Sequence, residues 1–382
     1  MSFETAQKFL DKLFEQDKVY WSNYFLKSIF EYKYVILDFF GGEVSLFPQL
    51  IEQIVQYFLQ KAAKYCPQWT ESYAIRLNTN LTTYFRGSPF RDFCLRYLPH
   101  IQMLGTLDGC KSFHDKTRLY PSGKGSFDDA LRGWKTWAED SGEKISSRLT
   151  VSPENMEYLM DSFHYFVDEL GLKEFRFYFT SEDTWKDKDK LRFKEILKQL
   201  ADEAIEKYPN VYIWFFDTAY ERNVKFANCG INGSVICLNW NGLIYNCFRF
   251  AEDSNALNRE TYYLGDVEHG ITRQDRLDYY RNFIIKWEDK CKKCPIHNCD
   301  PCPAFAYEYT GDLAKHPHYS CDLNRIGFDM GYYYFSRRIA WLMKKIENHS
   351  LKQEDLIYGK DSEVIRYFTE EEDGRDSKDK NS

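Results

Sequence analysis

Cysteine is the residue type in this chain whose spacing points most directly to chemistry. Four thiols lie within one short loop, at Cys291, Cys294, Cys299 and Cys302. Three more lie on either side of that loop, at Cys229, Cys247 and Cys321. Thiolates at such spacings can surround one metal centre, and neighbouring thiolates can also serve two centres. Spacing alone is equally consistent with zinc and with iron–sulfur, and it disfavours disulfides.

The rest of the sequence favours a reducing compartment for these thiols. The N-terminal residues form an amphipathic helical pattern rather than a signal peptide, with one apolar face made of Phe3, Ala6, Leu10, Leu13 and Phe14. No apolar run approaches the roughly eighteen residues that a membrane span needs. The net charge of −7 argues against nonspecific binding to nucleic acid or to an anionic membrane. We therefore expect a cytoplasmic, metal-binding protein with no nucleic-acid and no membrane partner.

Glycine and polar residues follow three of the expected strands at the point where each strand ends. These segments are Gly41-Gly42-Glu43, Asn78-Thr79-Asn80 and Asp108-Gly109. The carboxyl ends of parallel strands meet at one edge of a sheet, where such folds place their chemistry. Each segment alone is ordinary turn chemistry. Three at successive strand ends favour a shared site.

The elements that must position these residues alternate between strand and helix up to about residue 217. Strands are expected at 34–40, 73–80, 101–107, 145–151 and 175–180, and helices at 46–64, 90–97, 127–138, 152–171 and 191–208. Ser152 is expected as the N-cap of the fourth helix, Pro153 as its first residue and Gly171 as its end. Repeated units of this length predict an α/β fold with a parallel sheet or barrel covered by helices.

Beyond residue 222 the pattern changes. Residues 235–247 predict a β-hairpin that turns at Asn241-Gly242, and after the cysteine loop a helix is expected from about 328 to 347. The last residues are charged and poor in apolar side chains, which is typical of disorder. The sequence therefore predicts a barrel-like domain at 1–217, a small cysteine-rich domain at 222–350 and a disordered tail at 369–382.

The order of the cysteines, with Gly242 ahead of Cys247, resembles the seven-cysteine pattern of the SPASM domain. This domain is the auxiliary-cluster module of radical S-adenosylmethionine (SAM) enzymes that modify peptides. The resemblance implies one auxiliary [4Fe–4S] cluster held by Cys291, Cys294, Cys299 and Cys321. It implies a second held by Cys229, Cys247 and Cys302, with a fourth position that is open or filled from elsewhere. Cys237, which alternates with apolar neighbours, is expected to be a core thiol.

The resemblance to radical SAM peptide maturases extends back over nearly the whole chain. Residues 35–43 resemble the second strand and the Gly-Gly-Glu motif, and Asn78-Thr79-Asn80 resembles the third-strand Thr-Asn, with Leu81 where the family usually has Gly. Segments typical of the maturases follow at Thr106–Gly109, His114–Arg118, Gly123–Phe127, Arg148–Asn155 and Cys291–Pro295. Family usage implies a SAM site formed by Gly41, Gly42, Glu43, Asn80 and Arg148. A salt bridge is the alternative role for Arg148.

The 382 residues contain no Cys-x3-Cys-x2-Cys, the family motif that holds the cluster to which SAM binds. The expected fold is therefore an incomplete radical SAM partial (β/α)6 barrel that lacks its first strand, followed by a SPASM domain with a β-hairpin and a C-terminal helix. The expected function is the cross-linking, by a thioether for example, or oxidation of a ribosomally synthesised precursor peptide.

Because of the missing motif, we expect this chain alone not to cleave SAM. A misassigned start or a truncated or split gene would explain the gap, and SAM and a third [4Fe–4S] cluster would then belong to the intact family member. A separate maturase chain or N-terminal segment is a possible partner in that case. The alternatives are a pseudoenzyme that binds a precursor peptide or a partner maturase, and a zinc-stabilised binding protein.

Overall fold

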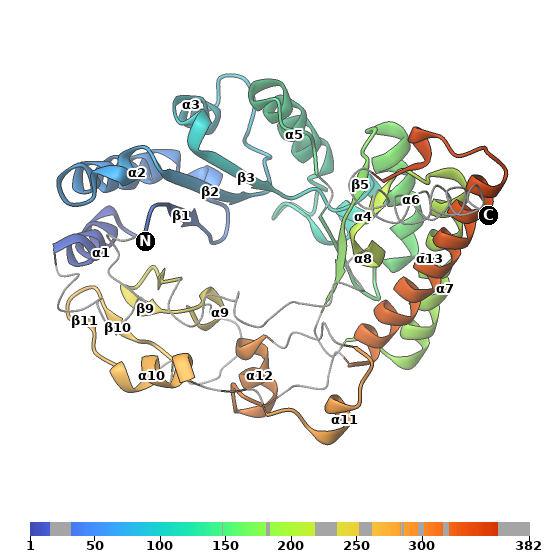
Figure 1. Cartoon of the computed structure of the whole chain (residues 1–382). Coiled ribbons are helices and arrows are strands. Elements are labelled where there is room, and N and C mark those ends of the chain that lie inside the picture. The colour runs from blue at the N-terminus through green and yellow to red at the C-terminus, as the bar shows by residue number, and fades with distance from the viewer. Residues whose placement is uncertain are drawn as a thin grey trace, which may run out of the picture. The chain divides into compact units, whose positions relative to one another are not determined.

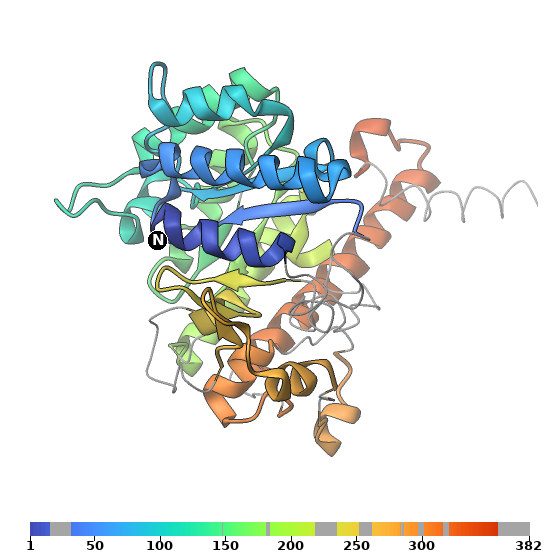
Figure 2. The same ribbon diagram turned by 90° about the vertical axis from the view of Figure 1, so that its left-hand side faces the viewer.

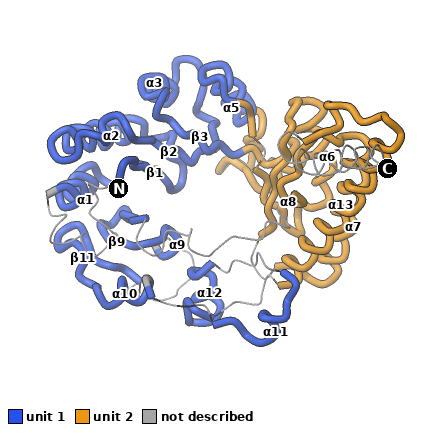
Figure 3. The backbone as a smooth tube through the Cα atoms, in the orientation of Figure 1, with its two compact units in different colours: residues 1–106, 129–143, 222–318 blue, residues 107–128, 144–221, 319–382 orange. Residues whose placement is uncertain are grey.

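The structure is a computed structural model of the chain (Figure 1). It describes residues 1–15, 32–146, 148–180, 184–217, 235–251, 262–282, 284, 286–296, 302–315 and 321–357. The chain divides into two compact units (Figure 3). Unit 1 comprises residues 1–106, 129–143 and 222–318, and unit 2 comprises residues 107–128, 144–221 and 319–382. Within the described ranges no helix has the length and apolar character required to cross a membrane.

Unit 1 begins with alternating helices and strands. In chain order they are α1 (Phe3–Glu15), β1 (Val35–Phe39), α2 (Pro48–Tyr65), β2 (Tyr73–Thr79), α3 (Pro89–Arg96), β3 (Ile101–Gly105) and α5 (Phe127–Ser141), whose first two residues belong to unit 2. Short 3-10 turns lie at Val44–Leu46, Pro67–Thr70 and Leu98–His100. Helix α1 runs alongside α2 (Figure 2), where the rings of Phe14 and Phe58 lie 5.7 Å apart. The predicted strands and helices of this region are confirmed, with ends shifted by a few residues.

Strands β1, β2 and β3 form one parallel sheet in that order. One face carries buried apolar side chains such as Ile75 and Met103. On the other face Asp38, Arg76 and Gln102 lie in register across the three strands. Arg76 Nη1 lies 3.4 Å from Asp38 Oδ2, and Arg76 Nε donates to Gln102 Oε1 at 3.2 Å. Successive side chains of a strand point to opposite faces of the sheet. The strand alignment that places these polar residues on one face therefore also places the apolar residues on the other.

An ion pair shielded from solvent links α3 to α5. Arg91 donates to both carboxylate oxygens of Asp140 at 2.8 Å, and the Tyr84 hydroxyl donates to Asp140 Oδ2 at 2.9 Å. Tyr84 is completely buried, and its ring meets Trp137 edge-on at 5.6 Å. The hydrogen bonds from Arg91 are the main cause that holds the pKa of Asp140 below its usual range. The contact therefore combines charge with aromatic packing.

The remaining described part of unit 1 is built from short elements. Its antiparallel sheet has the strand order β11-β10-β9-β8, with β8 at Cys237–Leu238, β9 at Leu243–Tyr245, β10 at Gly265–Asp266 and β11 at Gly270–Ile271. Its helices are α9 (Phe248–Ala251), α10 (Gln274–Asn282), α11 (Asp289–Lys292) and α12 (Pro303–Thr310). Strands β8 and β9 form the predicted hairpin, and Gly242 at its turn has φ +86°, a conformation that favours glycine.

Unit 2 combines short parallel strand pairs with two long helices. Its elements are α4 (Lys111–Thr117), β4 (Leu149–Val151), α6 (Leu159–His164), β5 (Glu174–Phe175), β6 (Phe177–Phe179), α7 (Asp187–Lys207), β7 (Tyr212–Ile213), α8 (Trp214–Asp217) and α13 (Cys321–Glu347). A short π-helical segment at Tyr165–Glu169 continues α6, and 3-10 turns lie at Met156–Tyr158 and Gln353–Asp355. Strand β4 pairs with β6 and β5 pairs with β7, both in parallel. Helix α13 lies along α7 (Figure 1), where the Tyr333 hydroxyl donates to Asp202 Oδ1 at 2.7 Å.

The predicted start of the helix after β4 is wrong. Residues 153–155 form a turn instead, in which the Asn155 N–H donates to the Ser152 carbonyl at 3.2 Å. The Asn155 side chain ties this turn to β4, because its Oδ1 accepts from the Ser152 N–H at 2.7 Å and its Nδ2 donates to the Thr150 carbonyl at 3.1 Å. Regular α-helix starts only at Leu159.

Two further predictions for unit 2 needed correction. The single strand expected at 175–180 is instead the pair β5 and β6, which bind different partner strands. The helix expected from 328 starts at Cys321, seven residues earlier. The expected helix end is confirmed, since Gly171 follows the π-helical segment with φ +66°. The predicted tail at 369–382 lies outside the described residues.

Candidate functional site

The carboxylate of Glu43 joins the ends of β1 and β2. Its Oε1 accepts from the Ser45 N–H at 3.1 Å, which caps the 3-10 turn after β1. The same oxygen accepts from the Thr79 hydroxyl at 2.5 Å, and Oε2 accepts from the Asn80 N–H at 2.9 Å. The structure therefore brings together Glu43 and Asn80, which the sequence placed at the ends of neighbouring strands. We call these residues the Glu43–Thr79–Asn80 network.

The two glycines before Glu43 leave the backbone open. Gly41 has φ +149°, a conformation that residues with a side chain rarely adopt. A Cβ added at Gly41 or at Gly42 would have no heavy atom within 4 Å, and both residues are exposed. Their peptide groups are therefore accessible to a ligand at the end of β1, as the predicted SAM site requires.

Leu81 adopts a backbone conformation that normally favours glycine. Its φ is +59°, in the left-handed region, although its side chain is fully buried. The Leu81 N–H donates to Thr79 Oγ1 at 3.1 Å and its carbonyl accepts from the Tyr84 N–H at 3.0 Å. A Cβ at Gly133 of α5 would lie 2.0 Å from the Leu81 carbonyl oxygen, so the close approach requires glycine there. The positive φ is one that glycine adopts without strain, and glycine is the residue that the sequence resemblance led us to expect at this position.

Asn80 and Arg148 keep polar groups available for a ligand. Asn80 Oδ1 accepts from the Thr82 N–H at 3.0 Å and from the Thr82 hydroxyl at 2.8 Å, whereas its Nδ2 has no partner among the described residues. Arg148 is exposed just before β4 in unit 2. It makes no ion pair with a described residue, so the salt bridge considered as its alternative role is not seen there.

A buried network in unit 2 has no counterpart in the sequence-based site prediction. The Asp108 N–H donates to His114 Nδ1 at 3.1 Å, so the neutral ring carries its proton on Nε2, which lies 3.1 Å from Ser126 Oγ. Ser126 Oγ donates to the Arg118 carbonyl at 2.9 Å, and Arg118 Nε donates to Asp108 Oδ2 at 2.6 Å. Burial is the main cause that lowers the pKa of His114. The Asp108-Gly109 strand end was noticed in the sequence, but its partners are set by tertiary contacts.

The described cysteines of the predicted clusters are partly exposed and lie at the ends of short elements. Cys291 and Cys294 lie one turn apart at α11, where the Cys294 N–H donates to the Cys291 carbonyl at 3.1 Å. Cys302 is the N-cap of α12 and Cys247 directly precedes α9. Cys321 is the first residue of α13 in unit 2.

These thiols are not gathered into a metal site in the part of the chain that the structure describes. There, no three His, Cys, Asp or Glu side chains form a group that could hold a metal ion. Cys229 and Cys299 lie outside the described residues, and each predicted ligand set contains one of them, so both sets stay predictions. For Cys237, burial raises the pKa of the thiol to about 12, with Cys247 and Asp38 as smaller causes.

No family model and no curated protein matches this chain. Among solved structures it resembles native anSMEcpe with bound AdoMet, with a TM-score of 0.63 and 18% identity over 88% of this chain and 89% of that chain. Native anSMEcpe with bound AdoMet and Cp18Cys peptide gives a TM-score of 0.60 and 17% identity, over 88% of this chain and 90% of that chain. At this level of identity the likeness shows a shared fold.

Proposed function

We propose that this chain is a radical SAM/SPASM-type protein that acts on a ribosomally synthesised precursor peptide. The observation that carries the proposal is the Glu43–Thr79–Asn80 network at the carboxyl ends of two parallel strands. It occurs in a fold shared with anSMEcpe structures that hold AdoMet and a peptide. Ligand binding at this edge of a parallel sheet is the general rule for such folds.

The residues at the end of β1 fit a SAM molecule. The open peptide groups of Gly41 and Gly42 would bind its amino group, and Glu43 holds that turn in place through the Ser45 N–H. Asn80 Nδ2 remains as a donor, and Arg148 would bind the carboxylate of SAM. In the family, SAM bound beside a reduced [4Fe–4S] cluster supplies hydrogen-atom abstraction from the peptide.

The proposal of two auxiliary [4Fe–4S] clusters rests on the seven-cysteine pattern, because the described thiols form no group by themselves. Anaerobic reconstitution with iron and sulfide tests it directly. We expect about eight iron and eight sulfide ions per chain when both auxiliary sites are filled. Cys247→Ser should lower the iron content to about four per chain, whereas the matched Cys237→Ser should leave it unchanged. Stoichiometric zinc without charge-transfer absorption would contradict the cluster assignment and favour the zinc-stabilised alternative.

A separate measurement tests the consequence of the missing Cys-x3-Cys-x2-Cys. The reconstituted chain, incubated with SAM and dithionite, should release no 5′-deoxyadenosine. Release of that product at a rate above the buffer control would show that other thiols hold a SAM-cleaving cluster.

A second candidate function is binding without catalysis. The observation that favours it is an intact Glu43–Thr79–Asn80 network in a sequence with no Cys-x3-Cys-x2-Cys. The protein would then present a precursor peptide to a separate maturase chain. Peptide modification that requires both this chain and a separate maturase chain containing Cys-x3-Cys-x2-Cys would support this role. Turnover that is unchanged by leaving this chain out would exclude it.

A further inference from the structure

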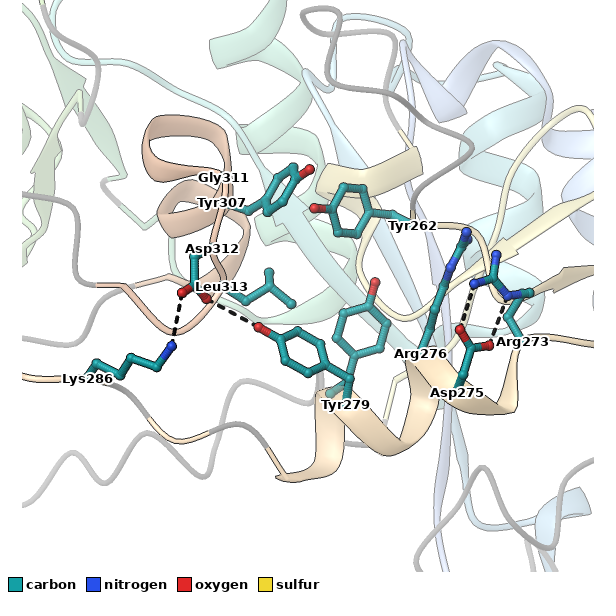
Figure 4. A pocket seen from close by; sticks show the side chains of 11 residues that line it. Tyr262, Arg273, Asp275, Arg276, Tyr279, Lys286, Tyr307, Gly311, Asp312 and Leu313 are labelled. Carbon is teal, nitrogen blue, oxygen red and sulfur yellow. Dashed lines mark hydrogen bonds and ion pairs between the residues drawn. The ribbon is translucent and has the colours of Figure 1, made fainter.

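Unit 1 contains a pocket beside α10 that none of the predicted sites uses (Figure 4). Its volume is about 540 Å³, within the range of small-molecule sites. It is lined by Tyr262, Arg273, Asp275, Arg276, Tyr279, Tyr280, Lys286, Tyr307, Gly311, Asp312 and Leu313. The lining thus combines aromatic rings with three cations and two carboxylates.

Both carboxylates of the pocket are already satisfied. Asp275 accepts from Arg273 Nε at 2.9 Å and from Arg273 Nη2 at 2.6 Å. Asp312 accepts from the Tyr279 hydroxyl at 3.2 Å and from Lys286 Nζ at 3.3 Å, and Figure 4 shows both contacts as dashed lines. Among the described residues, Arg276 is then the cation of the lining that forms no ion pair, although the charge of the neighbouring Asp275 acts on it.

Arg276 and Tyr280 offer donors that the protein does not use fully. Arg276 donates to the Tyr263 carbonyl at 2.6 Å and makes no ion pair with a described carboxylate. Burial, followed by repulsion from Arg273, lowers the pKa of Arg276, so a bound anion would relieve both effects. Tyr280 lies four residues further along α10, on the same helical face, and is only 2% exposed. Its hydroxyl makes no hydrogen bond with a described residue.

The opposite wall of the pocket is aromatic. The Tyr262 and Tyr307 rings meet edge-on at 4.3 Å, and in Figure 4 their hydroxyl groups point toward each other. Phe250 stacks on Tyr262 at 4.5 Å and on Tyr280 at 6.2 Å. This packing holds the rings in place, and the partly exposed Tyr307 and Tyr279 offer aromatic surface that suits an apolar or planar body.

We propose that this pocket binds a carboxylate carried on an apolar or aromatic body, with the Arg276 guanidinium and the Tyr280 hydroxyl as its donors. The single unpaired cation matches a monoanion, and a guanidinium fits a carboxylate with two parallel hydrogen bonds. A free aromatic acid and an acidic residue flanked by aromatic residues in a peptide present the same chemistry. The pocket involves none of the residues of the proposed SAM site.

Isothermal titration calorimetry on the full chain tests this site with four probes. They are 3-phenylpropanoate and its amide, and the peptides acetyl-Phe-Glu-Phe-amide and acetyl-Phe-Gln-Phe-amide. At least one carboxylate should bind at least about tenfold more tightly than its amide counterpart, because a charge-assisted hydrogen bond is replaced by a neutral one. Preference for the small acid or for the peptide identifies the source of the ligand.

Two variants test whether Arg276 and Tyr280 are the donors that bind the carboxylate. Arg276→Gln should abolish the preference for the carboxylate, whereas the matched Arg273→Gln should keep it, since Arg273 is occupied by Asp275. Tyr280→Phe removes one donor and should weaken the carboxylate about threefold and the amide by less, because a hydrogen bond to a charged acceptor is the stronger one. This second variant decides the question if Arg276→Gln does not fold.

Three results would overturn the proposal. They are equal binding of both carboxylates and their amides by the unaltered chain, an undiminished preference in folded Arg276→Gln or in Tyr280→Phe, and inorganic phosphate that binds more tightly than both carboxylates. Because no probe contains SAM and no readout needs turnover, the result does not depend on the proposed function.

Discussion

The sheet end around Glu43 and the cysteine region from 237 to 315 differ in what holds them together. At the sheet end, hydrogen bonds of 2.5 and 2.9 Å join consecutive strands above a buried core. In the cysteine region the strands are two or three residues long, two of the helices have four residues, and the described thiols form no metal-binding group. The contacts of the sheet end are therefore made by the protein's own side chains and backbone. In the cysteine region, a bound metal would add stability, since metal binding and folding are coupled in such sites.

The largest effect should come from loading the clusters. We expect amide hydrogen exchange in residues 237–315 to slow by about a thousandfold on anaerobic reconstitution. A ligand that binds the folded but not the unfolded form, at about a thousand times its Kd, stabilises the folded form by about 4 kcal/mol. Strands β1 to β3 should exchange at the same rate with and without iron. Equal protection of both regions before reconstitution would contradict the contrast drawn above.

A substitution behind the sheet end should cost nearly as much. Gly133→Ala places a Cβ 2.0 Å from the Leu81 carbonyl oxygen, and the resulting shift of α5 should lower the free energy of unfolding by about 3 kcal/mol. The matched Gly42→Ala meets no atom within 4 Å and should change it by less than about 0.5 kcal/mol. Urea denaturation of both variants measures the difference. Similar midpoints for the two would show that Leu81 is not rigidly held.

The ion pair between α3 and α5 should give an intermediate effect that depends on pH. The folded-state pKa of Asp140 is lowered, chiefly by Arg91, so its contribution is present above the unfolded value of about 3.9 and is lost as the pH falls through the folded value. At pH 7, Asp140→Asn should lower the free energy of unfolding by about 2 kcal/mol. Thermal unfolding between pH 7 and pH 3 should show a smaller loss of stability for the variant than for the unaltered chain. Asp92→Asn on α3, the helix that carries Arg91, is the control and should leave the pH dependence unchanged.

Glu43→Gln should have the smallest effect on stability. The amide keeps the shape of the side chain, but its single oxygen can replace only one of the two acceptor sites that bind Thr79 and Asn80, because its NH2 group cannot accept. We expect a cost of about 1 kcal/mol. Differential scanning calorimetry should show this loss in the chain before reconstitution, since no metal is needed for the network. Glu71→Gln, at an exposed position before the start of β2 and away from this sheet end, should show none. A loss that appears only after iron is added would place this network with the cysteine region instead.

Sequence reasoning predicted the parts that depend on local patterns. The strands at 35–39, 73–79 and 101–105 are apolar runs bounded by turn residues, and the hairpin follows from Asn241-Gly242. It placed Glu43 and Asn80 at neighbouring strand ends, which the hydrogen bonds confirm.

The features that sequence reasoning missed depend on local turns that interrupt an expected helix or on contacts between residues distant in the chain. Ser152 looked like an N-cap, but residues 153–155 form a turn and a 3-10 turn at Met156–Tyr158 follows before α6 begins at Leu159. The pairing of His114 with Ser126, twelve residues apart, leaves no periodic signal in the sequence. The pocket at Tyr280 likewise joins four separate segments, so composition showed only that aromatic residues are abundant.

The polar row of Asp38, Arg76 and Gln102 also has a consequence for how the chain avoids misfolding. If one strand slipped by a single residue, its member of the row would turn into the layer now filled by Ile75 and Met103. Burial of an unpaired charge there would cost several kcal/mol, so misaligned sheets are strongly disfavoured. The row thus acts as a check on strand alignment during folding, separately from any part that it takes in binding.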